Sequence, residues 1–576
     1  MSDTHYDVVI VGSGFGGSVM AYRLAEKKMR VCLLERGKPY PPNSFPRSPY
    51  RMGKNFWDPS EGRHGLYSIW AFRRMAAIVS SGLGGGSLIY SNVLLRKPEE
   101  TFKDEDEDGG YRVWPVTYRD LEAHYEQVER MMNVQPYPFD AAKARSSSTF
   151  PFDDDPYNTT HKTREMMVAA DKLKLDWSLP NLAVTFHNPG DAPLVGEPIV
   201  EQHPNLHNHT RYTCRLCGEC NVGCNYGSKN TLDYTYLSAA KREGAQIMTQ
   251  SEVRSFAPRD GGGYTINFVD HSGAEPDQPR KTSDLPLNTI TADRFVLACG
   301  TFGSTFLMLK NRDSFPGLSR RLGTRFSGNG DLLAILLNAK QRVNGKEVPR
   351  IFETGYGPVI TSAIHVKDKL EGGQGRGFYI EDAGFPDFGN WIYEMYDAPR
   401  NIPRLIRFVL RLVSQAFGFI TDSDLSAEVA DLLGPARASS TTLPLLAMGR
   451  DVPDGKMSLT CDGKLDLDWT KKRSSAFFEG VRRTAKQIAH VSEATFLDDP
   501  LWFIDRFVTV HPLGGCPMGH DKNEGVVDQF GQVFDYPGFY ITDGSIVPGP
   551  VGPNPSLTIA AITNRAADHI IENQKQ

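Results

Sequence analysis

The feature that most constrains the fold is a glycine-rich turn near the start of the chain. A β-rich run at Tyr6–Val11 is followed by Gly-Ser-Gly-Phe-Gly-Gly at 12–17 and then by a helix-like segment at Ser18–Lys27. A second β-rich run at Arg30–Leu34 ends on an acidic residue, Glu35. This order predicts a β-α-β unit whose turn binds a diphosphate at the helix N-terminus and whose acid binds a ribose. The predicted ligand is an adenine dinucleotide with a free 2′-hydroxyl.

The glycines of this turn have distinct predicted roles. Gly12 permits the change of direction, Gly14 lets the backbone approach the diphosphate, and Gly17 lets the helix lie close to the strand. The fingerprint alone does not separate NAD from FAD, because both ligands share the ADP half. The binding residues expected from this stretch are Gly12, Gly14, Phe15, Gly16, Gly17, Glu35 and Arg36.

A second glycine-rich loop favours FAD. Ser80–Ser87 reads Ser-Ser-Gly-Leu-Gly-Gly-Gly-Ser and precedes a strand-like segment at Leu88–Tyr90. Three consecutive glycines expose more backbone than a turn requires, so the loop can lie against a flat ring or a diphosphate. The flavin contacts expected here are Gly82, Gly84, Gly85, Gly86 and Ser87.

Two polar residues near the carboxyl end lie in turn-rich motifs. His511 directly precedes a proline, which biases it towards an extended conformation, and two glycines follow shortly after. Asn554 lies in Gly-Pro-Asn-Pro at 552–555, after a predicted strand within 539–545 and before a predicted helix at Ser556–Ile571. Alone, either residue would usually be a structural polar group in a turn.

Together these elements resemble the glucose-methanol-choline (GMC) oxidoreductases, and most closely the cholesterol oxidases among them. The His-Pro-Leu-Gly-Gly-Cys and Asp-Gly-Ser…Gly-x-Asn-Pro motifs of those enzymes match 511–516 and 543–555. The resemblance implies a non-covalently bound FAD and His511 and Asn554 as the catalytic pair, since a histidine can accept an alcohol proton while the flavin takes the hydride. It also implies cofactor contacts at Val253, Gly300, Asp543, Gly544, Asn554 and Pro555.

The chain departs from the cholesterol oxidase pattern in three places. The asparagine that follows the triple glycine in those enzymes falls at Ser91 in simple register, with Asn92 one position later, so both are candidates for that flavin contact. A second family signature is only partly kept at Gly300–Ser304. The third departure is the block between Glu381 and Thr442. At its start, Phe378–Pro386 resembles the stretch that carries a glutamate in cholesterol oxidases that also isomerise the steroid, so the resemblance implies that Glu381 could move that proton. A carboxyl group walled by aromatic residues has a raised pKa that suits proton transfer, whereas an acid in a loop is usually solvated.

The predicted fold is α/β, with a Rossmann-like FAD-binding domain of the GMC type and a discontinuous substrate domain of mixed β-sheet plus helices. We assign 1–45, 76–100, 230–312 and 500–576 to the FAD-binding domain, and 101–229 and 313–499 to the substrate-binding domain. An amphipathic segment at 402–420 carries arginines opposite an apolar face. We interpret it as a lid helix over the substrate pocket, with contact to a membrane surface as the alternative.

Four of the eight cysteines, Cys214, Cys217, Cys220 and Cys224, lie within eleven residues. Their spacing is that of a bacterial iron–sulfur run, although Asn225 replaces the proline that usually follows. The run continues into Gly227–Thr231, which resembles a segment of cholesterol-oxidase-like and long-chain-alcohol GMC proteins. We expect structural thiols and no metal, with a bound metal or cluster and a redox disulfide as alternatives.

Charge and the amino-terminal sequence bear on partners and location. The formal net charge of -5, from 64 basic and 69 acidic residues, provides no electrostatic footprint for nucleic acid. No basic segment followed by an apolar stretch and a cleavage site opens the chain, so no secretory signal is predicted. We expect a cytoplasmic protein, with peripheral membrane contact as the alternative.

The sequence therefore predicts FAD-dependent oxidation of the hydroxyl of a bulky hydrophobic alcohol, with a sterol as the leading candidate, to a carbonyl. Oxygen or another acceptor would receive the electrons. One alternative is a flavin dehydrogenase for another lipophilic or terpenoid alcohol that uses a non-oxygen acceptor. The other is a flavin-bearing binding or electron-transfer protein, against which the presence of both His511 and Asn554 argues.

Overall fold

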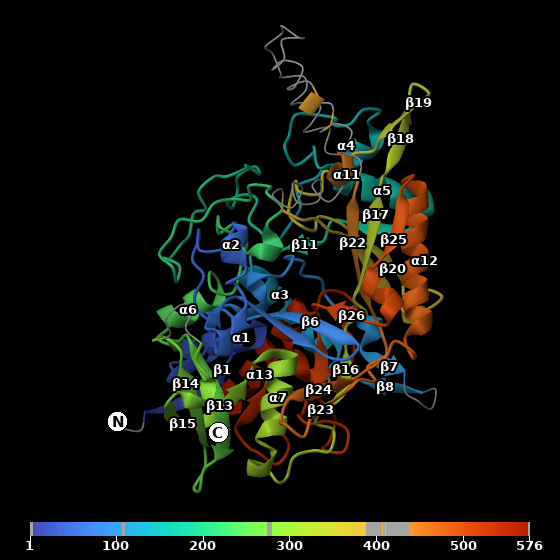
Figure 1. Ribbon diagram of the computed structural model, residues 1–576. Coiled ribbons are helices and arrows are strands. Elements are labelled where there is room, and N and C mark those ends of the chain that lie inside the picture. Colours follow the sequence, from blue (N-terminus) through green and yellow to red (C-terminus); the bar gives the residue numbers. More distant parts are fainter. Residues whose placement is uncertain are drawn as a thin grey trace.

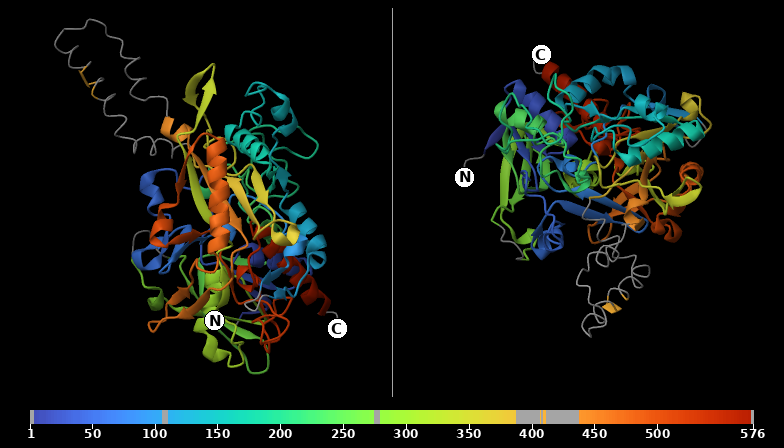
Figure 2. Two further views of the ribbon diagram at one scale, coloured as in Figure 1. Left: turned by 90° about the vertical axis from the view of Figure 1, so that its right-hand side faces the viewer. Right: turned by 90° about the horizontal axis from the view of Figure 1, so that it is seen from above.

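The computed structural model of the protein describes residues 4–105, 110–273, 279–386, 406, 409–410 and 437–573. Two large sheets organise these residues, one at the lower left and one at the upper right of Figure 1. Both chain ends lie in the part of the molecule that holds the first sheet (Figures 1 and 2). The predicted lid helix at 402–420 falls outside the described residues, apart from Ile406, Val409 and Leu410.

The first sheet has seven strands and contains the amino-terminal fingerprint. Its order is β12-β2-β1-β15-β14-β13, with β28 beside β15. The pairings of β1, β2, β12 and β28 are parallel, whereas β13, β14 and β15 form an antiparallel meander. The strands are β1 (His5–Val11), β2 (Val31–Leu34), β12 (Gln246–Met248), β13 (Ser251–Pro258), β14 (Tyr264–Asp270), β15 (Leu287–Leu297) and β28 (Phe539–Ile541).

The parallel part of this sheet is fully covered. Val8, Val9 and Ile10 of β1 have no exposed surface, as expected for a strand buried on both faces. Helix α1 packs against α6 and α13, and α13 packs against α3. These helices and α7, which follows β15, are α1 (Phe15–Glu26), α3 (Tyr118–Met131), α6 (Tyr236–Arg242), α7 (Gly300–Lys310) and α13 (Ser556–Asn573).

The second sheet has six strands in the order β10-β20-β21-β22-β17-β25. Two helices, α12 and α5, pack together, and α12 runs along the sheet in the left view of Figure 2. One face of these strands shares an apolar cluster with α12, and the buried residues of α12 recur with a helical period. The elements are β10 (Asp176–Ser178), β17 (Leu332–Leu337), β20 (Ala363–Val366), β21 (Phe378–Asp382), β22 (Leu443–Gly449), β25 (Thr495–Asp498), α5 (His161–Leu173) and α12 (Ser475–Val491).

Shorter elements connect the two sheets, and among them β26, β6 and β5 form a three-stranded sheet between the large ones in Figure 1. They are α2 (Pro49–Met52), β3 (Trp57–Asp58), β4 (Arg63–His64), β5 (Tyr67–Ala71), β6 (Met75–Ser80), β7 (Lys103–Glu105), β8 (Tyr111–Val113), β9 (Gln135–Pro136), α4 (Ala141–Ser146), β11 (Asn181–Leu182), β16 (Thr324–Ser327), β18 (Lys340–Val343), β19 (Lys346–Pro349), α11 (Arg437–Ser440), β23 (Lys456–Leu459), β24 (Leu465–Asp468), β26 (Phe507–Thr509) and β27 (Leu513–Gly515).

The predicted α/β class is confirmed, and two local details differ. The strand-like Leu88–Tyr90 is not a strand, because the glycines before it form a tight 3-10 turn, η2 (Gly85–Leu88). The six-stranded sheet is antiparallel throughout rather than mixed, since each of its pairings joins strands that run in opposite directions. Its strands all lie within 101–229 and 313–499, and the exact domain boundaries stay a prediction. Among the described helices, none is both long and apolar enough to cross a bilayer.

Candidate active site

The fingerprint turn lies between β1 and α1, and one of its glycines, Gly14, has open space where a Cβ would be. Gly12 has φ +97°, and a side chain there would meet the carbonyl oxygen of Ala298 at 2.2 Å, so only glycine fits. Phe15 and Gly16 begin α1, and a Cβ on Gly17 would lie 1.9 Å from the carbonyl oxygen of Gly12. Nothing lies within 4 Å of the position that a Cβ on Gly14 would take. The turn is therefore closely packed everywhere except where the diphosphate is predicted.

The acid at the end of β2 organises this turn. Glu35 is buried, and its Oε2 accepts hydrogen bonds from the backbone nitrogen (3.0 Å) and the hydroxyl (2.6 Å) of Ser13. Its Oε1 accepts one from Gly37 N at 2.8 Å. A carboxylate oxygen has more than one lone pair, so Glu35 can hold the turn and still accept a ribose hydroxyl. The neighbouring Arg36 lies over the Trp57 ring, 5.1 Å from its centre.

The triple-glycine loop packs directly on the fingerprint turn. Gly84 N donates to the hydroxyl of Ser13 at 3.0 Å, and a Cβ on Gly85 would lie 2.6 Å from the Cα of Gly14. Gly86 has open space where a Cβ would be. The Ser87 hydroxyl donates to the Gly84 carbonyl at 2.7 Å and closes the turn. The two glycine-rich loops thus form one continuous backbone surface, and Gly82 lies at its edge beside the Leu88 side chain.

The structure distinguishes the two candidates that follow the triple glycine. The hydroxyl of Ser91 donates to Asn221 Oδ1 at 2.7 Å. The side chain of Asn92 is completely buried, and neither its Nδ2 nor its Oδ1 has a hydrogen-bond partner among the residues that the structure describes. Asn92 also has φ +70°, a left-handed conformation that asparagine tolerates better than most residues. Its unsatisfied amide therefore fits a ligand contact better than the Ser91 hydroxyl does.

The predicted contacts from the carboxyl-terminal half meet at the start of α7. Asp543 Oδ2 accepts hydrogen bonds from Gly300 N at 2.8 Å and from the hydroxyl of Ser304, and Oδ1 accepts one from Ser545 N at 2.8 Å. Burial raises the pKa of Asp543, and these hydrogen bonds oppose the shift. Gly544 begins a 3-10 turn that packs on α7. Of the other expected contacts, Val253 is buried in β13 and Pro555 directly precedes α13.

These residues fit an FAD molecule by two observations. Open space exists at Gly14, Gly86 and Gly300, all of them at backbone turns where a ligand is predicted to approach. Buried polar side-chain atoms without a partner gather in the same segments, and native proteins rarely leave such atoms unpaired. Those atoms belong to Ser81, Asn92, Thr542, Ser545 and Asn554.

The side chain of His511 is held by an acid that the sequence did not single out. His511 Nδ1 lies 2.8 Å from Asp331 Oδ1. Asp331 Oδ2 accepts hydrogen bonds from the hydroxyl of Thr509 (2.9 Å), Val510 N (2.8 Å) and His511 N (3.2 Å). A carboxylate only accepts, so in the neutral ring Nδ1 carries the proton and Nε2 has the free lone pair.

The same turn supports the asparagine motif. Asn329 Nδ2 donates to the carbonyl oxygens of Gly552 (3.4 Å) and Pro553 (3.0 Å), and Gly552 N donates back to Asn329 Oδ1 at 3.0 Å. Asp331 lies two residues further along the turn. A single short segment before β17 therefore positions both predicted catalytic motifs, which lie about 40 residues apart from each other in sequence.

Glu381 lies beside Asn554 and is not in a solvated loop. It belongs to β21, has no exposed surface, and its Oε2 is 3.5 Å from Asn554 Nδ2. Within the described part of the chain, its Oε1 and the Oδ1 of Asn554 have no hydrogen-bond partner. Burial raises the pKa of Glu381 to about 8, the negative charges of Asp382 and Asp331 add to the shift, and the Asn554 hydrogen bond opposes it. The structure thus brings the predicted residues His511, Asn554 and Glu381 together around Asp331.

Sequence reasoning missed Asp331 and Asn329. The sequence Gly-Asn-Gly-Asp at 328–331 does signal a turn with left-handed residues, and Asn329 and Gly330 have φ values of +53° and +66°. Nothing in the sequence connects this turn to His511, which lies 180 residues later. That connection depends on β17 and β26 being neighbours in the fold.

Family models match three parts of the chain. The family model described as GMC oxidoreductase matches residues 203–314 in its amino-terminal part and 464–563 in its carboxyl-terminal part. A model described as an NAD(P)-binding Rossmann-like domain matches residues 10–39. Among solved structures, pyridoxine 4-oxidase from Mesorbium loti superposes with a TM-score of 0.52 at 16% identity, covering 98% of this chain and 99% of that one.

Curated relatives extend over nearly the whole chain. A cholesterol oxidase of Mycobacterium tuberculosis is 30% identical over 98% of this chain and 90% of its own length. A cholesterol oxidase of Acinetobacter baumannii is 27% identical over 99% of this chain and 96% of its own length. A long-chain-alcohol oxidase of Arabidopsis thaliana is 19% identical over 98% and 67%. With its two glycine-rich loops and its carboxyl-terminal motifs in one site, the chain belongs to the GMC oxidoreductase family and is an FAD-dependent enzyme.

Proposed function

We propose that the protein oxidises the hydroxyl group of a bulky hydrophobic alcohol to a carbonyl, with a sterol as the first substrate to test. The observation that carries this proposal is the hydrogen-bonded pair of His511 and Asp331 beside the buried Glu381 and Asn554. The cholesterol oxidases among the relatives support the substrate class.

In the proposed reaction, His511 acts as the base. Its Nε2 accepts the hydroxyl proton, and Asp331 holds the ring so that Nε2 is the nitrogen without a proton. FAD, when bound, would accept the hydride that leaves the carbon bearing this hydroxyl group. The Asn554 amide, held only by a long 3.5 Å contact to Glu381, is available to donate a hydrogen bond to the substrate oxygen.

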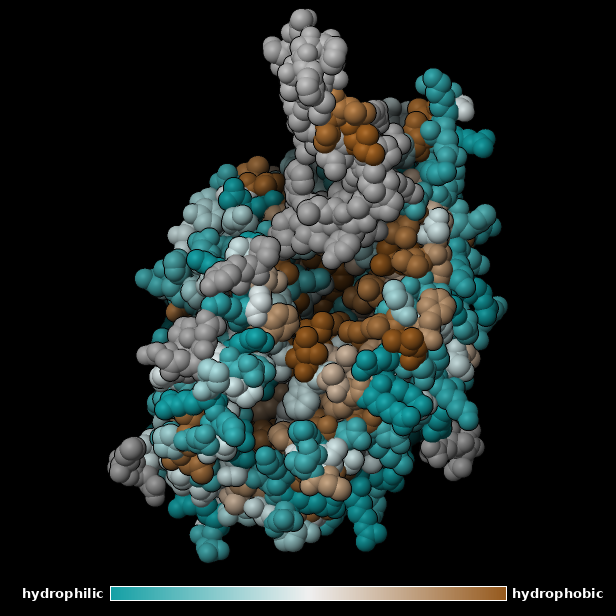
Figure 3. Space-filling model, viewed as in Figure 1, coloured by the Kyte–Doolittle hydropathy of each residue, from teal (hydrophilic) through white to brown (hydrophobic). Residues whose placement is uncertain are grey.

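An apolar hollow lies where such an alcohol would enter. Figure 3 shows it bordered by hydrophobic side chains, at the place where β6, β26 and β17 lie in Figure 1. Exposed apolar side chains come from these strands or their neighbours: Ile69 on β5, Leu333 on β17 and Val510 directly after β26. Val510 immediately precedes the proposed base. An apolar entrance of this kind favours a lipophilic substrate over a small polar one.

Glu381 suits a second proton-transfer step if the substrate is an unsaturated sterol. Its Oε1 is buried without a partner, and its pKa is raised to about 8, so the group can exchange a proton with a neighbouring carbon acid near neutral pH. We propose it as the residue that moves the proton during double-bond isomerisation. A Glu381→Gln variant would then still form the carbonyl while the double bond stays in place.

We also propose that FAD is held without a covalent bond. His64, the histidine shortly before the triple glycine, packs against the rings of Trp57 and His271 at 5.5 and 5.1 Å between centres. Acid or heat denaturation followed by filtration should release the flavin from the chain. Flavin that stays attached to the polypeptide would contradict this part of the proposal.

The experiment that tests the function compares three alcohols in anaerobic stopped-flow flavin reduction: a sterol, a long-chain primary alcohol and a small diol. We expect the sterol to reduce the flavin fastest and His511→Gln to slow that reduction by about 10² to 10⁴ with FAD still bound. His520→Gln, which changes an exposed histidine, is the matched control. Faster reduction by the diol, or an unchanged rate in His511→Gln, would overturn the proposal. Reoxidation by oxygen or by an artificial acceptor then separates an oxidase from a dehydrogenase.

A further inference from the structure

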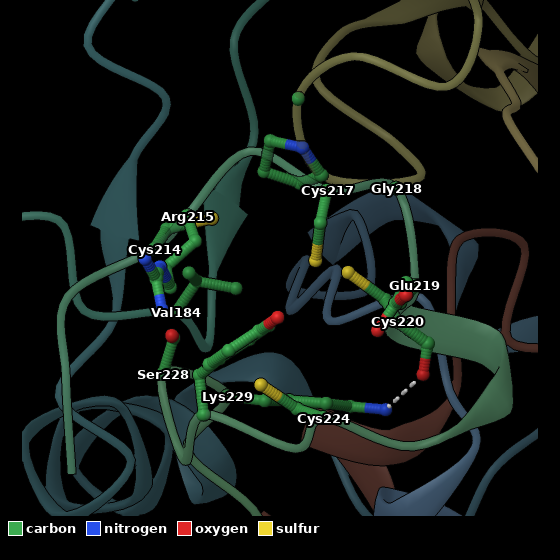
Figure 4. A pocket seen from close by; sticks show the side chains of 13 residues that line it. Val184, Cys214, Arg215, Cys217, Gly218, Glu219, Cys220, Cys224, Ser228 and Lys229 are labelled. Atoms are coloured by element: carbon green, nitrogen blue, oxygen red, sulfur yellow. Dashed lines mark hydrogen bonds between the residues drawn. The ribbon is translucent and has the colours of Figure 1, made fainter. Parts of the chain in front are cut away.

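All four cysteines of the 214–224 run line one pocket. Cys214, Cys217, Cys220 and Cys224 all contribute to its wall. In Figure 4 the sulfur atoms of Cys217, Cys220 and Cys224 lie around its interior. All four thiols are free, so the loop is not closed by disulfides. Four thiols around one space are more than packing requires, since a free cysteine in a core otherwise behaves as a small apolar residue.

The loop that carries these thiols is built in an unusual conformation and fixed from outside. Leu216 has φ +56° and Gly218 has φ +64°, which turns the chain around the pocket. Both are anchored to Gly357, whose carbonyl accepts from Gly218 N and whose nitrogen donates to the Leu216 carbonyl, each at 3.0 Å. Arg47 donates to the carbonyl oxygens of Val222 and Gly223 from another side. A left-handed leucine persists only where the surroundings impose it.

A buried cation lies at this pocket without a counter-ion. Lys229 lines the pocket and is 1% exposed, and its Nζ donates to the carbonyl oxygens of Cys220 (2.9 Å) and Leu88 (3.1 Å). Among the described residues, no carboxylate lies within salt-bridge distance of this Nζ, and the nearby Asp233 is paired with His207 at 2.6 Å. Burying a charge without an opposite charge is costly. An anionic group bound in the pocket would remove that cost.

The pocket adjoins the loop that is expected to hold the flavin. The Lys229 ammonium bridges Cys220 to Leu88, the last residue of η2. Ser91, just after that loop, donates to Asn221 within the cysteine run. A redox group in the pocket would therefore be a neighbour of the triple-glycine loop.

We propose that Cys214, Cys217, Cys220 and Cys224 bind an iron–sulfur cluster. The first three have the spacing with which a bacterial run ligates one four-iron cluster, and the pocket brings Cys224 to the same space. A cluster ligated by four thiolates carries a net negative charge and would be a counter-ion for Lys229. Among the described side chains, no three potential ligands converge on a point that could hold a single metal ion. A structural zinc site requires such convergence at about 2.3 Å, whereas a cluster of several irons and sulfides spans a wider space. The structural role that the sequence predicts for the thiols is the alternative that the test decides.

The test uses the full chain purified without oxygen and reconstituted with equal amounts of ferrous and ferric iron and with sulfide. Iron, zinc and acid-labile sulfide are measured per chain, and the dithionite-reduced protein is examined by electron paramagnetic resonance. Two ferrous ions, two ferric ions and four sulfides form a [4Fe–4S]²⁺ core on the four thiolates, and the thiols release their protons, so the binding step needs no further oxidant or reductant. The variants are a Cys217→Ser/Cys220→Ser double change and Cys461→Ser, an exposed cysteine outside the run. FAD content reports whether each variant is folded.

We expect about four irons and four sulfides per chain, with a cluster signal, in the unchanged protein and in Cys461→Ser. The double variant should retain FAD and lose iron and sulfide to background. Three results would overturn the proposal: iron in the unchanged protein no higher than in the double variant, stoichiometric zinc in place of iron, or a disulfide within the run in anaerobically prepared protein. If the double variant does not fold, the iron, zinc and sulfide content of the unchanged protein is sufficient to support or reject the cluster.

Discussion

His511 Nδ1 lies 2.8 Å from Asp331 Oδ1, and the other oxygen of the same carboxyl group accepts hydrogen bonds from the backbone around His511. The acid therefore fixes both the ring and the chain that carries it. A base whose free nitrogen must face the substrate needs its other nitrogen held by an acceptor. This relationship makes Asp331 a positioning residue for the proposed proton transfer.

We expect Asp331→Asn to slow flavin reduction by alcohol by about 10² to 10⁴, because an amide can donate to Nδ1 and so stabilise the tautomer with the proton on Nε2. Stopped-flow reduction with the best alcohol measures the loss. FAD content should stay unchanged, since Asp331 contacts none of the predicted cofactor residues in the hydrogen bonds it makes. Asp466→Asn, on an exposed position of β24, is the control. A wild-type rate in Asp331→Asn would rule out the positioning role.

Asn554→Ala should also slow reduction, by up to about 3 kcal/mol in activation free energy, because it removes a donor to the developing carbonyl oxygen. The limiting rate of flavin reduction should fall, whereas the apparent dissociation constant of the substrate should stay unchanged. Asn523→Ala changes an exposed asparagine and should have no effect. If Asn554→Ala weakened apparent substrate affinity and left the limiting rate unchanged, Asn554 would act in substrate binding alone.

The sequence predicted the parts of the fold that local patterns control. The fingerprint strand, turn and helix lie within a few residues of their predicted positions, because hydrophobic periodicity and glycine turns act over short distances. The triple-glycine segment was misread as leading into a strand, since the left-handed Gly84 and Gly85 start a 3-10 turn instead. Glycine runs permit several turn types, and packing against Gly14 selects one.

The sequence predicted a site residue only where that residue belongs to a recognisable motif. His511, Asn554 and Glu381 belong to recognisable motifs, but Asp331 and Asn329 act through contacts that span 180 and 223 residues of sequence. Such contacts depend on which strands become neighbours in the fold. The choice between Ser91 and Asn92 likewise needed the structure, because only burial and hydrogen bonding separate them.

We expect Asn92→Gly to weaken FAD binding by about tenfold, the cost of roughly one buried hydrogen bond. Glycine retains the left-handed conformation at φ +70°, so this variant removes the amide without straining the backbone. FAD affinity is measured by titration of the apoprotein. Ser91→Ala is the matched control, because its hydroxyl contacts Asn221 instead. If Ser91→Ala weakens FAD binding more than Asn92→Gly does, Ser91 and not Asn92 makes the flavin contact.

The last prediction concerns the buried acid beside Asn554. The pKa of Glu381 is raised from 4.5 to about 8, so between these values the folded protein keeps a proton that the unfolded chain has lost. Stability therefore falls as pH rises through this window, by up to about 1.4 kcal/mol per pH unit from this one group, and levels off above the folded pKa. Glu381→Gln carries no such titration. Its stability relative to the unchanged protein should rise from pH 5 to pH 8 and then stay constant, as measured by denaturant unfolding at a series of pH values. Glu572→Gln, at an exposed position near the end of α13, should show no pH-dependent difference. Parallel pH profiles for Glu381→Gln and the unchanged protein would mean that Glu381 is ionised in the folded state, and its proposed part in proton transfer near neutral pH would fail with that result.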